Sequence, residues 1–215
     1  MAQALTRRTP RATPAAMDGH PWLARTIDVM MRPLYPARRL VVPEARGDVL
    51  ELGVGTGLNF GLYGQVGSLA GIDPDAFMLE RARTRAAELA LPIELHQAGA
   101  EALPFDRGRF DTVVMTFTLC TIPDVAASLA EARRVLKPGG RMLFVEHTRS
   151  TQPNLGRVQD ALTPLWKRIG GGCHLNRSAP DLIARAGFEV VEHEPVWRER
   201  WTLLPVYRGV AQNPA

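Results

Sequence analysis

The fold of this chain is decided by the stretch Val49-Leu50-Glu51-Leu52-Gly53-Val54-Gly55-Thr56-Gly57. The compact apolar run at its start predicts a strand. Glycine then stands at every second position, and glycine lets a backbone approach a ligand closely and adopt positive φ without strain. The stretch therefore predicts a strand, a tight ligand-binding turn, and a short helix that begins at Leu58.

Strands and helices alternate outward from this stretch. Strands are predicted at residues 48–52, 67–73, 93–97, 110–115, 141–146, 189–196 and 202–211. Helices are predicted at residues 22–35, 37–42, 76–89, 124–136, 155–169 and 178–186, with Asp75 and Asp124 as N-caps. This alternation predicts an α/β fold, with a parallel sheet and helices on both faces. The tight link between the last two strands permits only an antiparallel hairpin.

Composition and charge limit the remaining possibilities. Residues 1–18 have no acid before Asp18, which predicts a disordered tail ahead of a single domain at residues 19–215. The net charge of +4 is spread along the front of the chain, so it indicates solvated arginines rather than a nucleic-acid patch. The arginines of this front segment include Arg25, Arg32, Arg38 and Arg39.

The sequence gives little indication of a membrane-spanning helix or of disulfide bonds. No apolar run approaches the roughly 20 residues that a membrane-spanning helix needs. The sequence has two cysteines, which fits a reducing compartment, although a single disulfide stays open. A cytoplasmic location is predicted on this basis.

An acidic residue supports the ligand-binding interpretation of the glycine turn. Asp73 lies at the end of the next predicted strand, where Rossmann-type sites place the carboxylate that meets ribose hydroxyls. The alternative is an ordinary surface carboxylate. A dinucleotide fingerprint requires glycine where Leu58 stands, which argues against a nicotinamide cofactor. Glu51, two residues before the turn, suits a zwitterionic ligand that carries a sulfonium cation better than a pyrophosphate.

Five motifs occur in order along the chain. They are Val49–Gly57, Gly71-Ile72-Asp73-Pro74, Ala100-Glu101-Ala102-Leu103-Pro104-Phe105, Phe110-Asp111-Thr112-Val113-Val114, and Arg134-Val135-Leu136-Lys137-Pro138-Gly139-Gly140. Over about residues 22–212 they resemble the class I S-adenosylmethionine-dependent methyltransferases, in the ubiquinone/menaquinone-methyltransferase-like group (methyltransferase type 11). Three further segments are similar to the microsomal alkyl-thiol methyltransferases. These segments are Thr118-Leu119-Cys120, Glu146-His147 and Gly172-Cys173-His174-Leu175-Asn176-Arg177.

The resemblance implies a Rossmann-like seven-stranded sheet with an antiparallel last strand, and it implies S-adenosyl-L-methionine as cofactor. It places the cofactor's methionine part over Gly53, Gly55 and Gly57, with Thr116 at the same end. The ribose would lie on Asp73. The adenine would contact Pro74, Phe77 or Met78, and Ala100 and Glu101.

The chain departs from these families at two points. The quinone enzymes usually have an aspartate that binds the adenine amino group, and Gly99 occupies that position. Glu101 or a backbone carbonyl is therefore expected to accept this hydrogen bond. The thiol enzymes carry an N-terminal hydrophobic anchor, which this sequence does not contain.

Two histidines are candidates for chemistry on the methyl acceptor. His147 follows the fifth predicted strand, at the sheet edge where ligands bind, and could deprotonate or orient the acceptor. An ordinary loop hydrogen bond is an equally good interpretation. His174 lies in a glycine-rich loop that could close over the acceptor. Cys120 and Cys173 lack paired ligand spacing, so no metal site is predicted.

An apolar stripe marks the first predicted helix. Its members are Trp22, Leu23, Ile27, Met30, Leu34 and Tyr35. A lid over the active site is the favoured interpretation, ahead of a packing helix and of a peripheral membrane contact. Trp166, Trp197 and Trp201 are further candidates for an apolar acceptor pocket.

The expected acceptor is a small molecule. Thr116-Phe117-Thr118-Leu119 stands where nucleic-acid and protein-amide N-methyltransferases have an Asn/Asp-Pro-Pro-aromatic motif, and no RNA-binding module appears. A hydrophobic thiol is favoured. A quinone precursor or a phospholipid amine is the alternative, and a non-catalytic binding module stays open. The oligomeric state is not predicted.

Overall fold

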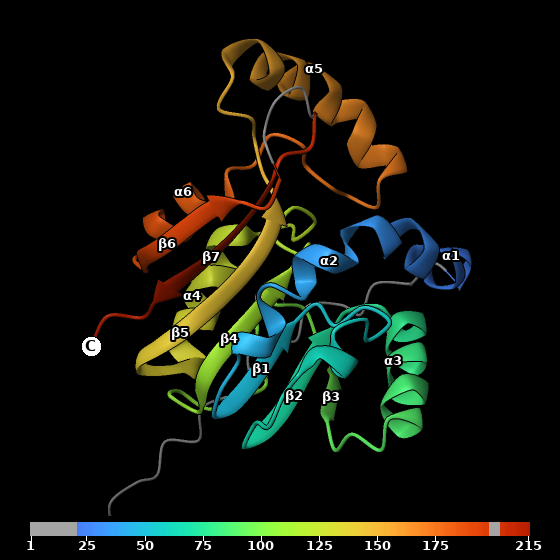
Figure 1. The fold of residues 1–215 in the computed structure, drawn as a ribbon, viewed down its shortest axis with the longest axis vertical. Helices are drawn as coiled ribbons and strands as arrows, with labels where there is room; N and C mark the ends of the chain where they lie inside the picture. The colour runs from blue at the N-terminus through green and yellow to red at the C-terminus, as the bar shows by residue number, and fades with distance from the viewer. Residues whose placement is uncertain (1–20, 198–202) are drawn as a thin grey trace, which may run out of the picture.

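The computed structural model describes residues 21–197 and 203–215 (Figure 1). The predicted tail at residues 1–18 and the candidate Trp201 lie outside these ranges. Within them, seven strands form one sheet in the order β3-β2-β1-β4-β5-β7-β6. The strands are β1 (Asp48–Leu52), β2 (Ser68–Asp73), β3 (Glu94–Gln97), β4 (Phe110–Thr116), β5 (Leu136–His147), β6 (Glu189–Pro195) and β7 (Val206–Gln212). The α-helices are α1 (Pro21–Met31), α2 (Tyr35–Arg38), α3 (Ala76–Glu88), α4 (Val125–Val135), α5 (Pro153–Ile169) and α6 (Ala179–Arg185).

The predicted sheet topology is confirmed. β1 is parallel to β2 and β4, β4 is parallel to β5, and β7 is antiparallel to both β5 and β6. Helices cover both faces of the sheet, with α2 on one side and α4 and α6 on the other (Figure 1). Successive strand residues point to opposite faces, so Val49 packs beside α2 while Leu50 packs in the core under α4.

The first predicted helix is divided in the structure. α1 ends at Met31 and a 3₁₀ turn follows at Arg32–Leu34. Pro33 explains the break, because proline has no N–H to donate and its ring clashes with the preceding turn. Pro36 is tolerated because it lies in the first turn of α2, where the N–H would be unpaired in any case.

The glycine turn leads into a helix shorter than predicted. Only a 3₁₀ helix, Phe60–Leu62, lies between β1 and β2. Gly61 and Gly64 follow closely on the turn, and each glycine costs about 1 kcal/mol relative to alanine in a helix. A regular α-helix is therefore not favoured there.

β5 is longer at its start than predicted. The prediction began at Arg141, whereas the observed strand begins at Leu136 and pairs with Phe110. The register shifts between Phe110 and Thr112, and this irregularity accommodates the glycine pair before Arg141. The predicted caps are confirmed, because Asp75 accepts from the backbone of α3 and Asp124 accepts from that of α4.

α5 lies beyond the carboxyl ends of the parallel strands, apart from the sheet (Figure 1). Among the residues that the structure describes, no helix combines the length and the apolar character needed to cross a membrane.

Candidate functional site

The glycine turn and Asp73 form one hydrogen-bonded unit. Gly53, Gly55 and Gly57 all have positive φ, at 74°, 54° and 80°. The Asp73 carboxylate is 8% exposed and accepts the Gly55 N–H at 2.9 Å and the Asp75 N–H at 2.9 Å. A side chain at Gly53 would meet Thr118 at 2.5 Å, whereas the space in front of Gly55 is open. The arrangement leaves an open backbone surface beside a fixed carboxylate, as a nucleoside ligand requires.

Burial changes the charge state of Asp73. Desolvation raises the pKa of its carboxyl to about 6, against the opposing effect of the two backbone N–H donors. Asp73 is therefore no surface carboxylate. Its role toward the ribose stays a prediction.

Glu51 belongs to a buried polar network behind the turn. Its carboxylate accepts from Asn59 Nδ2 at 2.7 Å and from the Tyr63 hydroxyl at 2.8 Å. Asn59 also donates to Thr116 Oγ1 at 2.9 Å. Arg38 completes the network by donating to Asn59 Oδ1 at 3.0 Å and to Thr116 Oγ1. Two predicted cofactor residues, Glu51 and Thr116, are thus joined through groups that the sequence analysis did not single out.

Arg38 corrects the prediction of solvated arginines. It is only 7% exposed, and its guanidinium lies 5.1 Å from the centroid of the Phe117 ring. Burial lowers the pKa of Arg38, while the nearby Glu51 and Glu146 carboxylates oppose that shift. Arg38 is held in the core by its hydrogen bonds to Asn59 and Thr116, and the charges of the two nearby acids favour its ionised form.

The predicted adenine side lies between the end of β2 and the segment that follows β3. Met78 is buried, whereas Phe77 is 46% exposed at the start of α3. Pro74 offers its carbonyl to Gln97 Nε2 at 3.2 Å, and Ala100 is buried. These residues line one region, although their contacts with a cofactor are untested.

Glu101 fills the space left by Gly99. A Cβ atom at Gly99 would lie 2.7 Å from Glu101 Oε2. The other oxygen, Oε1, accepts the Asp124 N–H at 3.3 Å. The Glu101 carboxylate therefore lies where the side chain of the missing aspartate would begin, which is consistent with its predicted role at the adenine amino group.

The chain turns sharply at the end of β4. Phe117 has a φ of 56°, a strained value for a residue with a side chain. The turn aims the Thr118 and Leu119 N–H groups at Glu146 Oε1, at 2.7 and 2.9 Å. Burial raises the pKa of Glu146 to about 7, although these donors, His147 and Arg38 oppose the shift. Its second oxygen is buried and has no hydrogen-bond partner among the described residues.

His147 lies at the carboxyl end of β5, as predicted, and it meets a cysteine. Its Nε2 atom lies 2.9 Å from Cys173 Sγ, while its Nδ1 atom is buried and unpartnered within the described ranges. Cys120, which is buried, also reaches this pair, and the three ligand atoms lie within 4.8 Å of one another. Sequence spacing could not show this cluster, because its members follow β4, β5 and α5.

The cluster stabilises a thiolate at Cys173. A hydrogen bond from Cys120 and the proximity of His147 lower the pKa of Cys173 to about 4, against the effect of burial. The same hydrogen bond, together with burial, raises the pKa of Cys120 well above its ordinary value. The shared hydrogen bond therefore favours ionisation of Cys173 over ionisation of Cys120.

His174 has a structural contact. Its backbone N–H and its Nδ1 atom both approach the Cys120 carbonyl, at 2.9 and 3.1 Å. Burial lowers the pKa of His174, so the ring is neutral near pH 7. These bonds join the glycine-rich loop to the end of β4. A catalytic role for His174 stays untested.

α1 lies against the glycine turn and α3. Asp28 contacts Thr56 Oγ1 and forms ion pairs with Arg81 at 3.1 Å and Arg85 at 2.8 Å. Arg85 in turn donates to the Thr56 carbonyl at 2.7 Å. This position supports the lid interpretation. The predicted stripe is only partly buried: Trp22 and Met30 are each 61% exposed, whereas Leu34 packs against the core.

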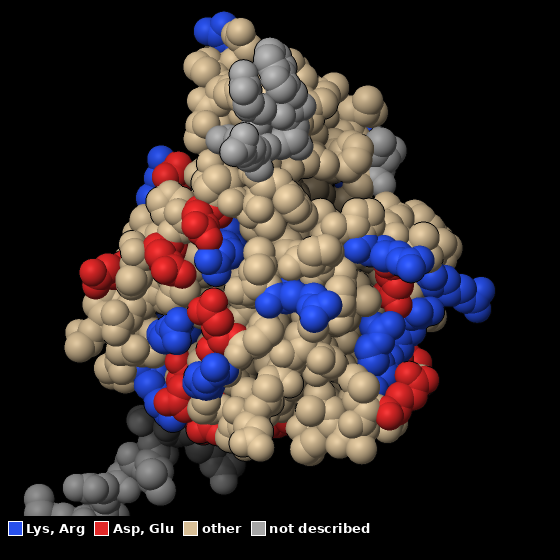
Figure 2. Space-filling view, in the orientation of Figure 1, with Lys and Arg blue, Asp and Glu red and all other residues tan. Residues whose placement is uncertain are grey.

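α5 presents its apolar side chains outward. Val158, Leu162, Leu165 and Trp166 are 37–59% exposed. Gln159 faces inward instead, accepting from the Ser150 N–H at 2.7 Å and donating to the Leu203 carbonyl at 2.9 Å. Figure 2 shows few charged side chains over the upper part of the molecule, where α5 lies. Trp197 is 43% exposed, whereas the partly exposed Trp166 also forms a side-chain hydrogen bond with Cys173.

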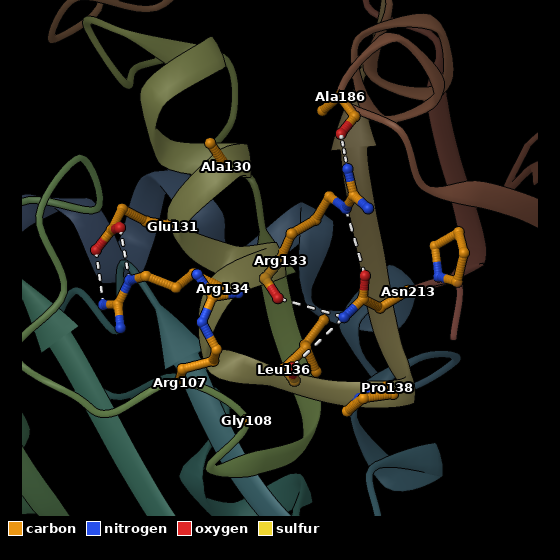
Figure 3. A pocket seen from close by; sticks show the side chains of 11 residues that line it. Arg107, Gly108, Ala130, Glu131, Arg133, Arg134, Leu136, Pro138, Ala186 and Asn213 are labelled. Carbon is orange, nitrogen blue, oxygen red and sulfur yellow. Dashed lines mark hydrogen bonds and ion pairs between the residues drawn. The ribbon is translucent and has the colours of Figure 1, made fainter.

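A pocket of 550 Å³ lies at the opposite end of the strands from the glycine turn, beside the start of β5 (Figure 3). Two of the arginines that line the pocket form hydrogen bonds and an ion pair within the fold. Arg133 donates to the Ala186 carbonyl at 3.1 Å and to Asn213 at 3.3 Å, and Arg134 pairs with Glu131 at 2.7 Å. The pocket is therefore separate from the residues predicted to bind cofactor and acceptor.

Comparisons with known proteins identify relatives of this chain. Residues 50–144 match the family described as "Methyltransferase domain". The phosphatidylethanolamine N-methyltransferase of Cereibacter sphaeroides is 36% identical over 152 residues, which are 70% of this chain and 74% of that protein. The thiol S-methyltransferase TMT1B of Rattus norvegicus is 35% identical over 150 residues, 68% of this chain and 62% of that protein.

The fold is also found among solved methyltransferase structures. The solved structure of a geranyl diphosphate methyltransferase in complex with S-adenosylmethionine superimposes with a TM-score of 0.67 at 16% identity, over 93% of this chain and 94% of that one. With the ordered motifs and the seven-stranded sheet, these similarities establish the cofactor and the reaction class. The chain belongs to the family of S-adenosylmethionine-dependent methyltransferases.

Proposed function

We propose that this methyltransferase transfers the methyl group to the sulfur atom of a small hydrophobic thiol. The observation that carries the proposal is the His147–Cys173 contact at 2.9 Å, at the carboxyl end of β5. The surroundings lower the pKa of the Cys173 thiol to about 4. A histidine beside the bound acceptor can accept the proton of its thiol, and the thiolate that results is the nucleophilic form.

In this reaction, the residues of the chain orient the donor and accept a proton. Methyl transfer is an in-line displacement in which the acceptor sulfur gains the methyl group and the donor sulfonium becomes a thioether. In the proposal, the glycine turn, Asp73 and Thr116 orient the donor, because orientation is the main contribution that a protein makes to such a step. In the proposal, His147 takes up the proton that the acceptor thiol loses.

Apolar surface beside the site supports a hydrophobic acceptor. α1 and α5 both lie near the carboxyl ends of the strands (Figure 1), and each exposes large apolar side chains. They include Trp22 and Met30 on α1 and Leu165 and Trp166 on α5. Burying an alkyl chain against such surface contributes about 25 cal/mol per Å². The similarity to a thiol S-methyltransferase points the same way.

Two other acceptors remain candidates. A phospholipid amine is favoured by the similarity to a phosphatidylethanolamine N-methyltransferase and by the basic side chains Arg157 and Lys167 on α5. A quinone precursor is suggested by the motifs and by the similarity to a demethylmenaquinone methyltransferase. We also propose that the acceptor is a small molecule and that the protein acts in the cytoplasm. In this proposal, α1 forms a lid over the bound acceptor.

The test is a methyl-transfer assay with S-adenosylmethionine and four acceptor types. Alkyl thiols, phenols, a demethylated quinol and phosphatidylethanolamine vesicles are compared at equal concentrations. We expect turnover on alkyl thiols, rising with chain length, and a loss of at least tenfold in His147→Gln. His96→Gln is the matched control, because His96 lies on β3 and contacts Glu94. Turnover confined to the amine or the quinol would overturn the proposal.

A further inference from the structure

The two cysteines of this chain lie together although they are 53 residues apart. Cys120 follows β4, and Cys173 lies in the loop after α5. Their sulfur atoms are within 4.8 Å of each other. The backbone around them is also joined, because the His174 N–H donates to the Cys120 carbonyl at 2.9 Å. Little movement would be needed for the two sulfurs to bond.

We propose that Cys120 and Cys173 form a reversible disulfide that switches methyl transfer off under oxidation by hydroperoxides. Cys173 is the attacking residue, because it is half-buried and paired with His147, and Cys120 is the resolving residue, because it is buried beside it. A reactive thiolate with a second thiol next to it is the arrangement of redox-sensing sites. The proposal does not depend on the identity of the methyl acceptor.

The chemistry proceeds in two balanced steps. The Cys173 thiolate attacks one oxygen of hydrogen peroxide and the O–O bond breaks. The hydroxide that leaves takes a proton from solvent, which gives water and a sulfenic acid. Cys120 then loses its proton to His147 and its sulfur attacks the sulfenic sulfur. The S–S bond forms, and hydroxide leaves with that proton as water. Two thiols are oxidised, and one peroxide is reduced to two waters.

A metal site explains the same cluster less well. Zinc binds sulfur at about 2.3 Å and nitrogen at about 2.0 Å in tetrahedral geometry, so its sulfur and nitrogen ligands stand roughly 3.6 Å apart. The His147–Cys173 separation is 2.9 Å, a hydrogen-bond distance.

The disulfide would act on the acceptor side of the site. It would link the loop after α5 to the chain after β4, where Glu146 already holds the Thr118 and Leu119 N–H groups. It would also consume the thiolate beside His147. The glycine turn and Asp73 take no part, so cofactor binding should survive oxidation.

The experiment treats the purified full chain with hydrogen peroxide and then with a phosphine reductant, which cannot serve as a thiol acceptor. Intact mass should fall by about 2 Da, and peptide mapping should join the peptides of Cys120 and Cys173, since the chain has no other cysteine. Methyl transfer should fall at least tenfold and return after reduction, while the affinity for S-adenosylhomocysteine should change less than threefold.

A variant and a metal analysis complete the test. Cys120→Ser should show mass gains of about 16 and 32 Da at Cys173 in place of the loss of 2 Da, because no resolving thiol remains. The proposal is overturned if peroxide leaves both thiols open to alkylation, or if the protein as purified carries one zinc ion per chain. These readouts are masses, so they stand apart from any failure to find the methyl acceptor.

Discussion

Replacing Arg38 by methionine should destabilise the protein strongly at pH 8 and much less at pH 5.5. Arg38 is 7% exposed and lies between the buried acids Glu51 and Glu146. Removing one partner from a buried charged group typically costs about 3–5 kcal/mol of unfolding free energy, because the remaining charge is left uncompensated. We expect a cost in this range at pH 8.

The pH dependence follows from the two carboxyls. Burial raises the pKa of Glu51 and of Glu146 to about 7, above the value of an unfolded glutamate. A carboxyl with a raised folded pKa gives stability that is present below the unfolded pKa and is lost as pH rises through the folded pKa. Without Arg38 the pKa values of both carboxyls in the folded protein rise further. Each added pKa unit then lowers the unfolding free energy at pH 8 by about 1.4 kcal/mol, until the folded pKa reaches about 8. At pH 5.5 both carboxyls are protonated in either protein.

The assay is urea unfolding of wild type and Arg38→Met at the two pH values. Arg39→Met is the control, because the neighbouring Arg39 is exposed and should change the unfolding free energy by less than about 0.5 kcal/mol. The reasoning is refuted if Arg38→Met costs less than about 1 kcal/mol at pH 8, or if its cost is equal at pH 8 and pH 5.5.

Three further perturbations test other parts of the site. Gly53→Ala should weaken S-adenosylhomocysteine binding at least tenfold, measured by calorimetry, because the φ of Gly53 is 74° and the new Cβ would meet Thr118 at 2.5 Å. Gly61→Ala is the control and should leave binding unchanged, because the space beside Gly61 is open. The affinity for S-adenosylmethionine should rise about three- to tenfold from pH 6 to pH 8, because Glu51 ionises over this range. The affinity for S-adenosylhomocysteine, whose sulfur is uncharged, should stay nearly constant. If both affinities changed equally with pH, the result would contradict a carboxylate near the sulfonium. Asp28→Asn should speed proteolysis within α1 several-fold, because its ion pairs with α3 are lost, and an unchanged rate would show that α1 is held otherwise.

Local sequence patterns predicted the sheet, the glycine turn and the helix caps well. The glycine turn, the acid at the end of β2 and the helix caps depend on residues close together in sequence, so spacing was sufficient to place them. The division of the first helix could also have been predicted, because Pro33 stands inside its pattern. The glycines after the turn likewise signalled that no regular helix follows.

Tertiary contacts account for what the sequence could not show. Arg38 resembles a surface arginine until β1 and β5 bring two buried acids to it. The apolar spacing of α5 predicts an amphipathic helix, but only the inward contacts of Gln159 show that its apolar side faces out. Cys120, His147 and Cys173 converge because three separate elements end at one place.

The central claim is that the glycine turn and Asp73 bind the cofactor, and calorimetric titration of Asp73→Ala with S-adenosylhomocysteine tests it most directly. Two charge-assisted hydrogen bonds to ribose hydroxyls are together worth about 3 kcal/mol or more, so the dissociation constant should rise more than 100-fold. Circular dichroism confirms that the variant is folded, and Asp160→Asn, an exposed partner of Arg149, serves as control. A folded Asp73→Ala protein that binds within threefold of wild type would contradict the account.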